Sequence, residues 1–296
     1  MLNSECLELF ENYLKNEKKA SANTLSSYMR DIRQYAEYME EHDGSPITEA
    51  EDTELFAYIE HLKEAGKSVA TVSRSIASLK NLYSWLMISR MISSNPATGL
   101  VPEKSKQKLP QILTSREVDL LLEQPECVDA KGYRDKAMLE LLYATGIRVT
   151  ELIDLDVDDV NLKAGVVRCH SRDKERFIPM YPKAVKALSD YLELVRPQMI
   201  ALPDEQALFV NVSGERMSRQ GFWKLIKHYQ KKAAIEKEIT PHTLRHSFAA
   251  HLLENGADIH AIQEMLGHAD LSSTQVYSQL VKKQIKDVYN MAHPRA

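Results

Sequence analysis

The 296-residue chain has few cysteines, no long apolar run and no excess of positive charge. Its three cysteines, Cys6, Cys127 and Cys169, are too few and too widely spaced for a disulfide framework or a zinc-ligand cluster, so we expect free thiols in a reducing compartment. No uncharged apolar stretch reaches the roughly 18 residues of a membrane span, and residues 1–30 contain no apolar run of secretory type. These absences predict a cytoplasmic globular protein.

The formal net charge of −4 argues, taken alone, against a polyanionic partner. The charge is polarised along the chain, however. Residues 37–60 contain nine Asp and Glu and no Lys or Arg, whereas residues 61–110 contain eight Lys and Arg and two Glu. Phosphate binding depends on local cations more than on total charge, so the second segment, with Arg74 and Lys80, is a candidate DNA-binding surface. A solvated helix face is the alternative.

The first hundred residues predict four helices, because apolar side chains recur three and four positions apart, as in Leu25, Tyr28, Ile32 and Tyr35. Residues 93–110 (SSNPATGLVPEKSKQKLP) then contain three prolines and too few apolar residues to form a core. This stretch predicts an interdomain linker. We place a first domain at 1–100, a linker at 101–112 and a second domain at 113–296.

The second domain alternates between helices and short strands. Thr114 or Ser115 is expected to cap one helix, and the run GYRDKAMLELLYATG predicts a second helix that ends at Gly146. Thr150 is expected to cap a short helix through Leu155. Arg148 then lies in a tightly turned segment just after the glycine.

Two strands are predicted at 165–170 (GVVRCH) and 175–180 (ERFIPM), around a polar turn from Ser171 to Lys174, with 207–210 (ALFV) as a third strand. The fold class is therefore mainly α with a small β-sheet.

A basic amphipathic helix is predicted after these strands, with the sequence RQGFWKLIKHYQKKAAI. Arg219 and Lys224 lie beside Phe222 and Trp223 and are candidate DNA contacts. A packed tryptophan next to solvated lysines is the more common arrangement, and it is the expectation for Trp223.

Residues 241–268, PHTLRHSFAAHLLENGADIHAIQEMLGH, hold five of the ten histidines. Thr240 is a suitable N-cap for a helix that starts near His242, and Gly256 is suited to stop it. A second helix is expected to be capped by Asp258 and closed by Gly267.

Three interpretations of this histidine-rich stretch compete. A zinc site at His242 and His246 lacks the glutamate of an HExxH motif and has Arg245 beside it. A structural role in the core suits His251 and His260. A phosphate site would use His242 and Arg245, which are three residues apart at a helix N-terminus, together with a further residue at the next helix break, His268.

Several separated motifs carry a family resemblance. ATGIRVTEL (144–152), the histidine-rich stretch and the spacing G-H-x5-T-x2-Y from Gly267 to Tyr277 together resemble the tyrosine recombinase signature. KERFIP (174–179), the basic linker and the terminal HPRA are most similar to the Xer branch, in particular its XerD type. The resemblance covers the whole chain. It implies a C-shaped clamp made of a helical, SAM-like core-binding domain and a mixed α/β catalytic domain.

The resemblance also implies a reaction. Such an enzyme cuts and rejoins DNA at a specific site through a 3′-phosphotyrosine, without ATP, metal or another cofactor. The residues that match the family motifs are Arg148 and Arg245 as phosphate ligands, His242 as proton acceptor, His268 as phosphate donor and Tyr277 as nucleophile.

The turn between the two predicted strands departs from the family pattern. Xer proteins usually read G-K-G-x-K-E-R there, with the first lysine as general acid, whereas this chain reads H-S-R-D-K-E-R and lacks that lysine. Counting forward from Arg168 places Arg172 at the position of the acid, but an arginine is a poor proton donor at neutral pH. We therefore expect Lys174 to be the acid and Arg172 to contact phosphate.

The resemblance implies partners as well. Members assemble as four protomers on two double-stranded DNA sites, alone or with a second Xer-type recombinase, and exchange C-terminal segments. Val281, Ile285 and Val288 provide an apolar helical face for such an exchange, or for packing in the same protomer. The role implied is resolution of chromosome or plasmid dimers, or recombination of a mobile element. The alternatives are a type IB topoisomerase and a non-catalytic DNA-binding relative.

Overall fold

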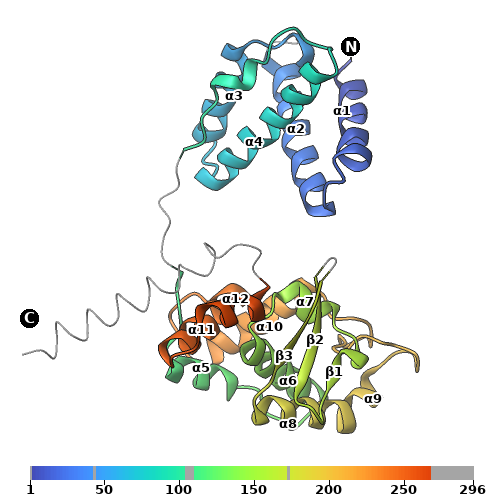
Figure 1. The fold of residues 1–296 in the computed structure, drawn as a ribbon, viewed down its shortest axis with the longest axis vertical. Helices are drawn as coiled ribbons and strands as arrows, with labels where there is room; N and C mark the ends of the chain where they lie inside the picture. The colour runs from blue at the N-terminus through green and yellow to red at the C-terminus, as the bar shows by residue number, and fades with distance from the viewer. Residues whose placement is uncertain (1, 43–44, 104–109, 172–173, 268–296) are drawn as a thin grey trace, which may run out of the picture. The chain divides into compact units, whose positions relative to one another are not determined.

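The computed structural model describes residues 2–42, 45–103, 110–171 and 174–267 (Figure 1). The chain forms two compact units, residues 1–107 and 108–296, each with its own hydrophobic core. The predicted fold class is confirmed, since helices dominate and the strands of the described residues form one three-stranded sheet. Among these residues, no helix has the length and apolar character needed to cross a bilayer.

The first unit contains the four predicted helices: α1 (Asn3–Asn12), α2 (Ala22–His42), α3 (Asp52–Glu64) and α4 (Val69–Ile88). A π-helical turn, Tyr13–Glu17, extends α1. Ile32 and Tyr35 of the predicted apolar face are fully buried. The Tyr35 and Tyr83 hydroxyls lie 2.8 Å apart, and Tyr83 donates to the Ile47 carbonyl at 3.0 Å, so the buried phenols are hydrogen-bonded.

The prediction that residues 93–110 contribute to no core is wrong at the N-terminal end of that stretch. Pro96–Gly99 forms a 3-10 turn, and both Ala97 and Leu100 are buried in the core of the first unit. The Asn95 side chain accepts from the Ala97 amide at 2.9 Å, which starts the turn. An Asx cap therefore folds this proline-containing segment back onto the helices.

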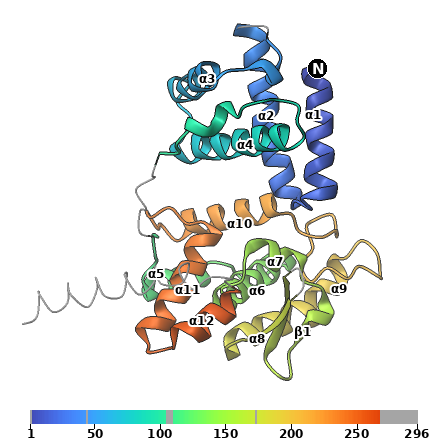
Figure 2. The same cartoon turned by 45° about the horizontal axis from the view of Figure 1, so that its top comes forward.

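The second unit contains the remaining elements, which Figure 2 shows from a second direction. Its helices are α5 (Ser115–Leu122), α6 (Ala130–Thr145), α7 (Val149–Asp154), α8 (Pro182–Asp190), α9 (Arg196–Met199), α10 (Arg219–Lys232), α11 (Pro241–Glu254) and α12 (Ile259–Leu266). Its strands are β1 (Val160–Asn161), β2 (Val166–Ser171) and β3 (Lys174–Pro179). Helix α6 is the centre of this unit, because it contacts α5, α7, α8, α11 and β3.

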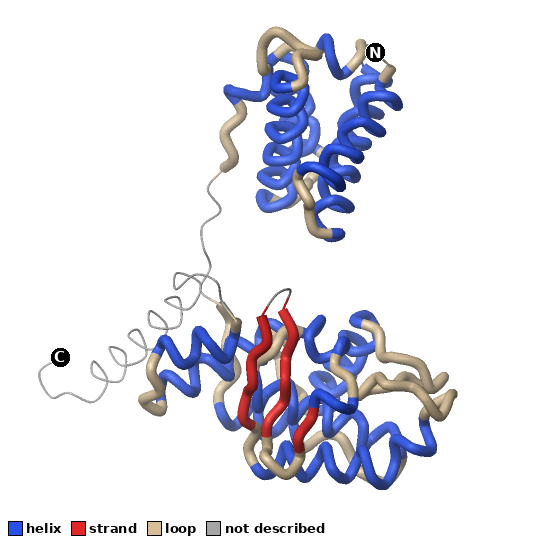
Figure 3. Tube along the Cα trace, turned by 45° about the vertical axis from the view of Figure 1, so that its right-hand side comes forward, coloured by secondary structure: helices blue, strands red, loops and turns tan. Residues whose placement is uncertain are grey.

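The sheet is antiparallel with β2 in the middle, and Figure 3 shows its strands in red. Val167 lies opposite Ile178, and both side chains are fully buried. The predicted hairpin is confirmed, but the predicted third strand is wrong. Residues 207–210 make only isolated bridges, to Asp156 and Arg216, and the third strand is Val160–Asn161. An apolar run such as ALFV is also compatible with a buried loop, which is what forms here.

The caps predicted for the histidine-rich stretch are confirmed. The Thr240 side chain accepts from the Thr243 amide at 3.1 Å, and Asp258 accepts from the amides of His260 and Ala261. Gly267 ends α12 in the left-handed conformation. These short-range bonds satisfy helix-terminal groups that would otherwise have no partner, which fixes where α11 and α12 begin.

Gly146 provides a test of the packing between α6 and α11. Its φ is +58°, and a Cβ there would lie 2.3 Å from Cδ1 of Phe248. We expect Gly146→Ala to lower the free energy of unfolding by roughly 2–4 kcal/mol, through left-handed strain plus steric overlap. Gly256→Ala is the matched control, because Gly256 also has a positive φ but has nothing within 4 Å of a Cβ. It should cost about 1 kcal/mol. Urea unfolding followed by circular dichroism measures both, and equal costs would contradict the packing explanation.

Candidate active site

Arg148 is placed by the end of α6. Gly146 ends that helix in the left-handed conformation, Ile147 is buried, and Arg148 occupies the N-cap position of α7. Its backbone N–H donates to the Glu151 carboxylate at 2.7 Å. The prediction that Thr150 caps this helix is therefore wrong, because the helix begins two residues earlier and a glutamate in its first turn supplies the cap.

The Arg148 side chain points to the end of α12. Its Nη2 donates to the carbonyl of Gly267 at 3.1 Å, and its Nη1 lies 3.3 Å from Glu151 Oε1. The side chain keeps 38% of its surface exposed. A guanidinium that is anchored by one N–H group and partly open to solvent can bind an anion through its remaining N–H groups.

Arg245 reaches the same place from α11. It is 4% exposed, and it donates through Nη1 to the Gly146 carbonyl at 2.6 Å and through Nη2 to the Leu266 carbonyl at 2.7 Å. Leu266 and Gly267 are consecutive, so the two arginines converge on the C-terminal end of α12. The structure thus brings together two of the predicted phosphate ligands, from segments about a hundred residues apart.

A buried carboxylate holds this arrangement. Glu151 accepts from Arg176 Nη1 at 2.8 Å and Nη2 at 2.9 Å, and Arg176 Nε donates to the Met265 carbonyl at 2.8 Å. Burial favours the protonated form of Glu151, but hydrogen bonds from Arg176 and from the Arg148 amide outweigh it and hold the pKa of the carboxyl below its usual value. Glu151 is therefore ionised at neutral pH and ties β3 to α7 and α12.

The histidines of α11 differ in environment. His242 is exposed in the first turn of the helix, and its ring centroid lies 6.4 Å from that of His246. Burial, with smaller contributions from His242 and Arg245, lowers the pKa of His246 to about 4. His246 is thus a neutral imidazole at physiological pH, beside the buried guanidinium.

His251 and His260 were both predicted to be structural. For His251 this is confirmed, since its Nδ1 lies 2.8 Å from the Tyr143 hydroxyl and its Nε2 lies 2.9 Å from the Leu113 carbonyl. His260 is exposed, so the prediction of a core histidine is wrong there. It lies at the start of α12, where the first turn faces solvent.

Some predicted site residues fall outside the described part of the chain, namely Arg172, His268 and Tyr277. Lys174 is the first residue of β3, and its Cα partner across the hairpin is Ser171. Lys174 thus closes the turn, and its side chain is not described. Gly267, the residue that precedes His268, is in place between the arginines: a Cβ there would lie 3.1 Å from the Arg176 guanidinium.

The predicted DNA-contacting residues have different surroundings. Arg219 and Lys224 are exposed on α10, and Lys80 is partly exposed on α4. Arg74 instead donates through Nε and Nη2 to both oxygens of Asp31, at 3.0 and 2.8 Å. Asp31 is only 3% exposed, so Arg74 neutralises a buried carboxylate.

The expectation that Trp223 is packed is wrong. The side chain is 48% exposed, and Lys227 Nζ lies 5.4 Å from the centre of its ring, whereas Phe222 is fully buried. Helix α10 therefore presents an aromatic and basic face to solvent.

Sequence reasoning missed Glu151 and Arg176. Glu151 follows Arg148 by three residues, the spacing at which a glutamate reaches back to an N-cap amide, so a local signal for it existed. Arg176 has no comparable signal, because its partner on α7 is 25 residues away.

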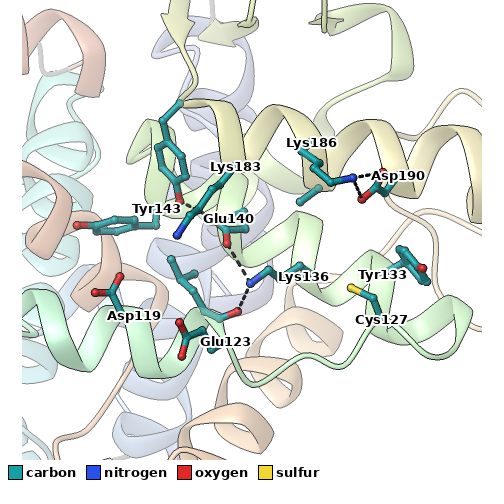
Figure 4. A pocket seen from close by; sticks show the side chains of 13 residues that line it. Asp119, Glu123, Cys127, Tyr133, Lys136, Glu140, Tyr143, Lys183, Lys186 and Asp190 are labelled. Carbon is teal, nitrogen blue, oxygen red and sulfur yellow. Dashed lines mark hydrogen bonds and ion pairs between the residues drawn. The ribbon is translucent and has the colours of Figure 1, made fainter.

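Figure 4 shows a cavity of about 380 Å³ that is separate from this arrangement. Residues of α5, α6 and α8 line it. Several of its charges are paired with one another: Glu140 accepts from Tyr181 and binds Lys136 at 3.1 Å, and Lys186 binds Asp190 at 2.8 Å. None of the predicted catalytic residues lines it.

Two family models match the chain. That of the phage integrase family matches residues 111–284, and that of the phage integrase N-terminal SAM-like domain matches residues 7–89.

Curated relatives match over nearly the full length. A tyrosine recombinase XerD from Staphylococcus epidermidis is 44% identical over 291 residues, covering 98% of this chain and 99% of the relative. A tyrosine recombinase XerD from Oceanobacillus iheyensis is 47% identical over 294 residues, covering 98% of each.

Solved structures share the fold. A XerH recombinase bound to palindromic difH substrate has a TM-score of 0.74 and 20% identity, covering 95% of this chain and 83% of that one. A lambda integrase dimer bound to a core site has a TM-score of 0.73 and 19% identity, covering 94% and 95%. The chain belongs to the phage integrase family and is a Xer-type tyrosine recombinase, an enzyme of site-specific DNA recombination.

Proposed function

We propose that this recombinase cleaves DNA with Tyr277 at a phosphate held by Arg148 and Arg245. The observation that carries the proposal is the convergence of the two guanidiniums on consecutive carbonyls at the end of α12. The next residue along the chain is His268, and Tyr277 follows nine residues later. The nucleophile thus lies within a short tether of the two cations.

The reaction conserves the energy of the bond that it breaks. The Tyr277 phenolate oxygen attacks phosphorus, the bond to the 5′-oxygen breaks, and a 3′-phosphotyrosine forms. A proton leaves the tyrosine and a proton joins the departing oxygen. Attack by a 5′-hydroxyl of another strand reverses the step, and this reversal rejoins DNA in a new combination.

Arginine suits the phosphate-binding role for a physical reason. Its guanidinium remains charged at any physiological pH and donates two parallel hydrogen bonds to two oxygens. The Arg148 and Arg245 side chains are already oriented by backbone carbonyls, so little reorganisation is needed as negative charge grows on the phosphorane. His242 accepts the tyrosine proton, and His268 donates to a phosphate oxygen.

A covalent trap tests the reaction directly. The Tyr277→Phe variant retains binding, so it can be used to select the DNA sequence that the protein recognises. On a duplex of that sequence with a nick near the cleavage point, the unmodified enzyme should accumulate a DNA adduct visible on a denaturing gel. Tyr277→Phe should give none, and Arg245→Ala should be slower by roughly 10²–10⁴-fold. A wild-type protein that binds the duplex but forms no adduct would show the non-catalytic alternative to be correct.

Two residues of the hairpin turn, Lys174 and Arg172, are candidates for the proton donor to the departing oxygen, and their chemistry separates them. We propose Lys174, because arginine at position 172 holds its proton too tightly at neutral pH. Lys174→Ala should slow cleavage by about 10²–10⁴-fold on ordinary DNA. A duplex with a 5′-bridging sulfur, whose leaving group needs no proton, should restore the rate of the variant that lacks the acid. Rescue of Arg172→Ala and not of Lys174→Ala would reverse the assignment.

DNA contact is proposed for the exposed basic residues Lys80, Arg219 and Lys224, with Arg172 on phosphate. Arg74 is also proposed to lie near phosphate, although its charge is balanced by Asp31. Trp223 and Lys227 extend the same face of α10.

Exchange of strands between two duplexes distinguishes this enzyme from a type IB topoisomerase.

Assembly is proposed to use the C-terminal segment, which lies outside the described residues. A cavity of about 450 Å³ lies where α12 ends, and its lining is mostly apolar: Tyr143, Met180, Phe248, Leu252 and Met265 contribute to it. We propose that Val281, Ile285 and Val288 of a neighbouring protomer fill this cavity in a tetramer of one or two Xer-type proteins on two DNA sites. Met265 lines the cavity, and its carbonyl accepts a hydrogen bond from Arg176, so occupancy would couple neighbouring active sites.

The docking proposal predicts separate effects on binding and on cleavage. Deletion after Lys282, or Leu252→Gln in the cavity, should reduce cooperative cleavage of paired sites about 10-fold or more and leave the affinity for a single site within about two-fold. Leu120→Gln is the matched control, because Leu120 is 40% exposed on α5 and outside the cavity. An equal loss of binding and cleavage in the deletion variant would contradict the proposal.

A further inference from the structure

Leu113, the first residue after the linker, is bonded to α11 through both of its backbone groups. Its amide donates to the Ser247 hydroxyl at 2.8 Å, and its carbonyl lies 2.9 Å from His251 Nε2. Leu113 and Ser247 are fully buried, and His251 is 8% exposed. Leu113 belongs to neither a helix nor a strand, so its buried backbone groups depend on these two side chains for partners.

The chemistry of the groups around His251 fixes the direction of each bond. A carbonyl oxygen can only accept, so Nε2 carries the proton that is donated to Leu113. In the neutral ring the other nitrogen, Nδ1, presents a lone pair, which accepts from the Tyr143 hydroxyl at 2.8 Å. His251 therefore joins α6, α11 and the end of the linker.

The two attachments lie one helical turn apart on the same face of α11. Ser247 and His251 are four residues apart, and the Ser247 hydroxyl also donates to the carbonyl of Thr243, one turn earlier. Arg245 precedes Ser247 by two residues, about 200° around the helix, and thus points to the opposite side. Two bonds one turn apart on one face fix both the rotation of the helix and its position along its axis.

The preceding residue, Ile112, adds an apolar contact close to the arginines. It packs against a small cluster that includes Phe248 of α11 and Leu266 of α12. The carbonyl of Leu266 is one of the two that accept from Arg245. Ile112 and Leu113, which we call the clasp, therefore contact the helix that carries Arg245 and the helix end to which its guanidinium is bonded.

We propose that the clasp positions α11 for catalysis: Ser247 and His251, by binding Leu113, hold the helix in the rotation that directs Arg245 at the phosphate. The inference rests on the proposed role of Arg245. Without the clasp, α11 is free to rotate or shift slightly, and a small displacement of a group that stabilises the phosphorane lowers the rate steeply. Ser247 and His251 are positioning residues, since they act through Arg245.

The first variant is Ser247→Ala, which removes the hydroxyl that binds the Leu113 amide. Ser247 does not line the apolar cavity where α12 ends, so the variant leaves the docking surface unchanged. On saturating nicked duplex in single turnover, we expect adduct formation to slow by about 10-fold, with affinity for uncut duplex within about two-fold of wild type.

The second test compares two substitutions of His251. His251→Phe removes the donor to the Leu113 carbonyl, whereas His251→Gln keeps an N–H that can reach it. We expect His251→Phe to slow cleavage by roughly 10–100-fold and His251→Gln to recover most of that loss. Because His251 also lines the docking cavity, the measure is the difference between the two variants. A glutamine variant as slow as the phenylalanine variant would contradict the role of this bond.

A double-mutant cycle shows whether the clasp acts through Arg245. In a protein that already carries Arg245→Ala, adding Ser247→Ala should change the rate by less than about two-fold, because the group that the clasp positions is absent. The same slowing in both backgrounds would overturn the positioning role.

Tyr191→Phe is the matched control for the loss of a buried hydrogen bond. Tyr191 is fully buried in the same unit, and its hydroxyl accepts from the buried Val210 amide at 3.4 Å. This variant also leaves a buried backbone amide without its hydroxyl acceptor, yet its cleavage rate should stay within about two-fold of wild type. Thermal unfolding measures the stability of each variant. If the rate falls with stability in Tyr191→Phe as it does in Ser247→Ala, the positioning role is wrong.

The outcomes separate this inference from the function on which it rests. A wild-type protein that forms no adduct overturns the proposed reaction, and an Arg245→Ala variant as fast as wild type overturns the phosphate-binding role of that arginine. An active wild type and a slow Arg245→Ala, together with full rates for Ser247→Ala and His251→Phe, overturn the clasp alone.

Discussion

The geometry of the site depends on one buried carboxylate, that of Glu151. It accepts two hydrogen bonds from the Arg176 guanidinium and one from the Arg148 amide, which uses most of the acceptor capacity of a carboxylate. Arg176 is 11% exposed, so without Glu151 it would be a buried charge with no counterion, a state that costs several kcal/mol. Because Arg176 also holds the Met265 carbonyl, this single group fixes β3, α7 and α12 relative to one another.

Features set by neighbouring residues could be predicted from the sequence. The caps at Thr240 and Asp258 and the left-handed glycines at 146 and 267 depend on contacts within four residues, and all were predicted correctly. The cap of α7 was misplaced at Thr150, because Arg148 is not a usual capping residue and the cap comes instead from the glutamate that follows it. Local chemistry thus fixes where the site elements begin and end, and it does so even where the capping residue is unusual.

Features set by distant partners could not be predicted. His251 and His260 have similar apolar neighbours in the sequence, yet only His251 meets a carbonyl and a phenol, which come from residues 138 and 108 positions away. Trp223 has the composition of a packed aromatic residue, but its neighbour Phe222 takes the buried position on α10. On α10, Phe222 is buried and Trp223 is 48% exposed, and the sequence does not state which of the two is buried.

The charge of the site follows from the kind of partner that each arginine has. Arg74 is bound by the carboxylate of Asp31, which cancels its charge. Arg245 donates to two carbonyl oxygens, which orient its guanidinium. Around the end of α12, Arg148 and Arg176 both bind the one carboxylate of Glu151, while Arg245 donates to the carbonyls of Gly146 and Leu266. A phosphodiester carries one negative charge and the phosphorane formed from it carries two, so guanidiniums at the proposed phosphate site would stabilise the transition state more than the substrate. A chain with a net charge of −4 can therefore gather several guanidiniums at one place, which its total charge does not indicate.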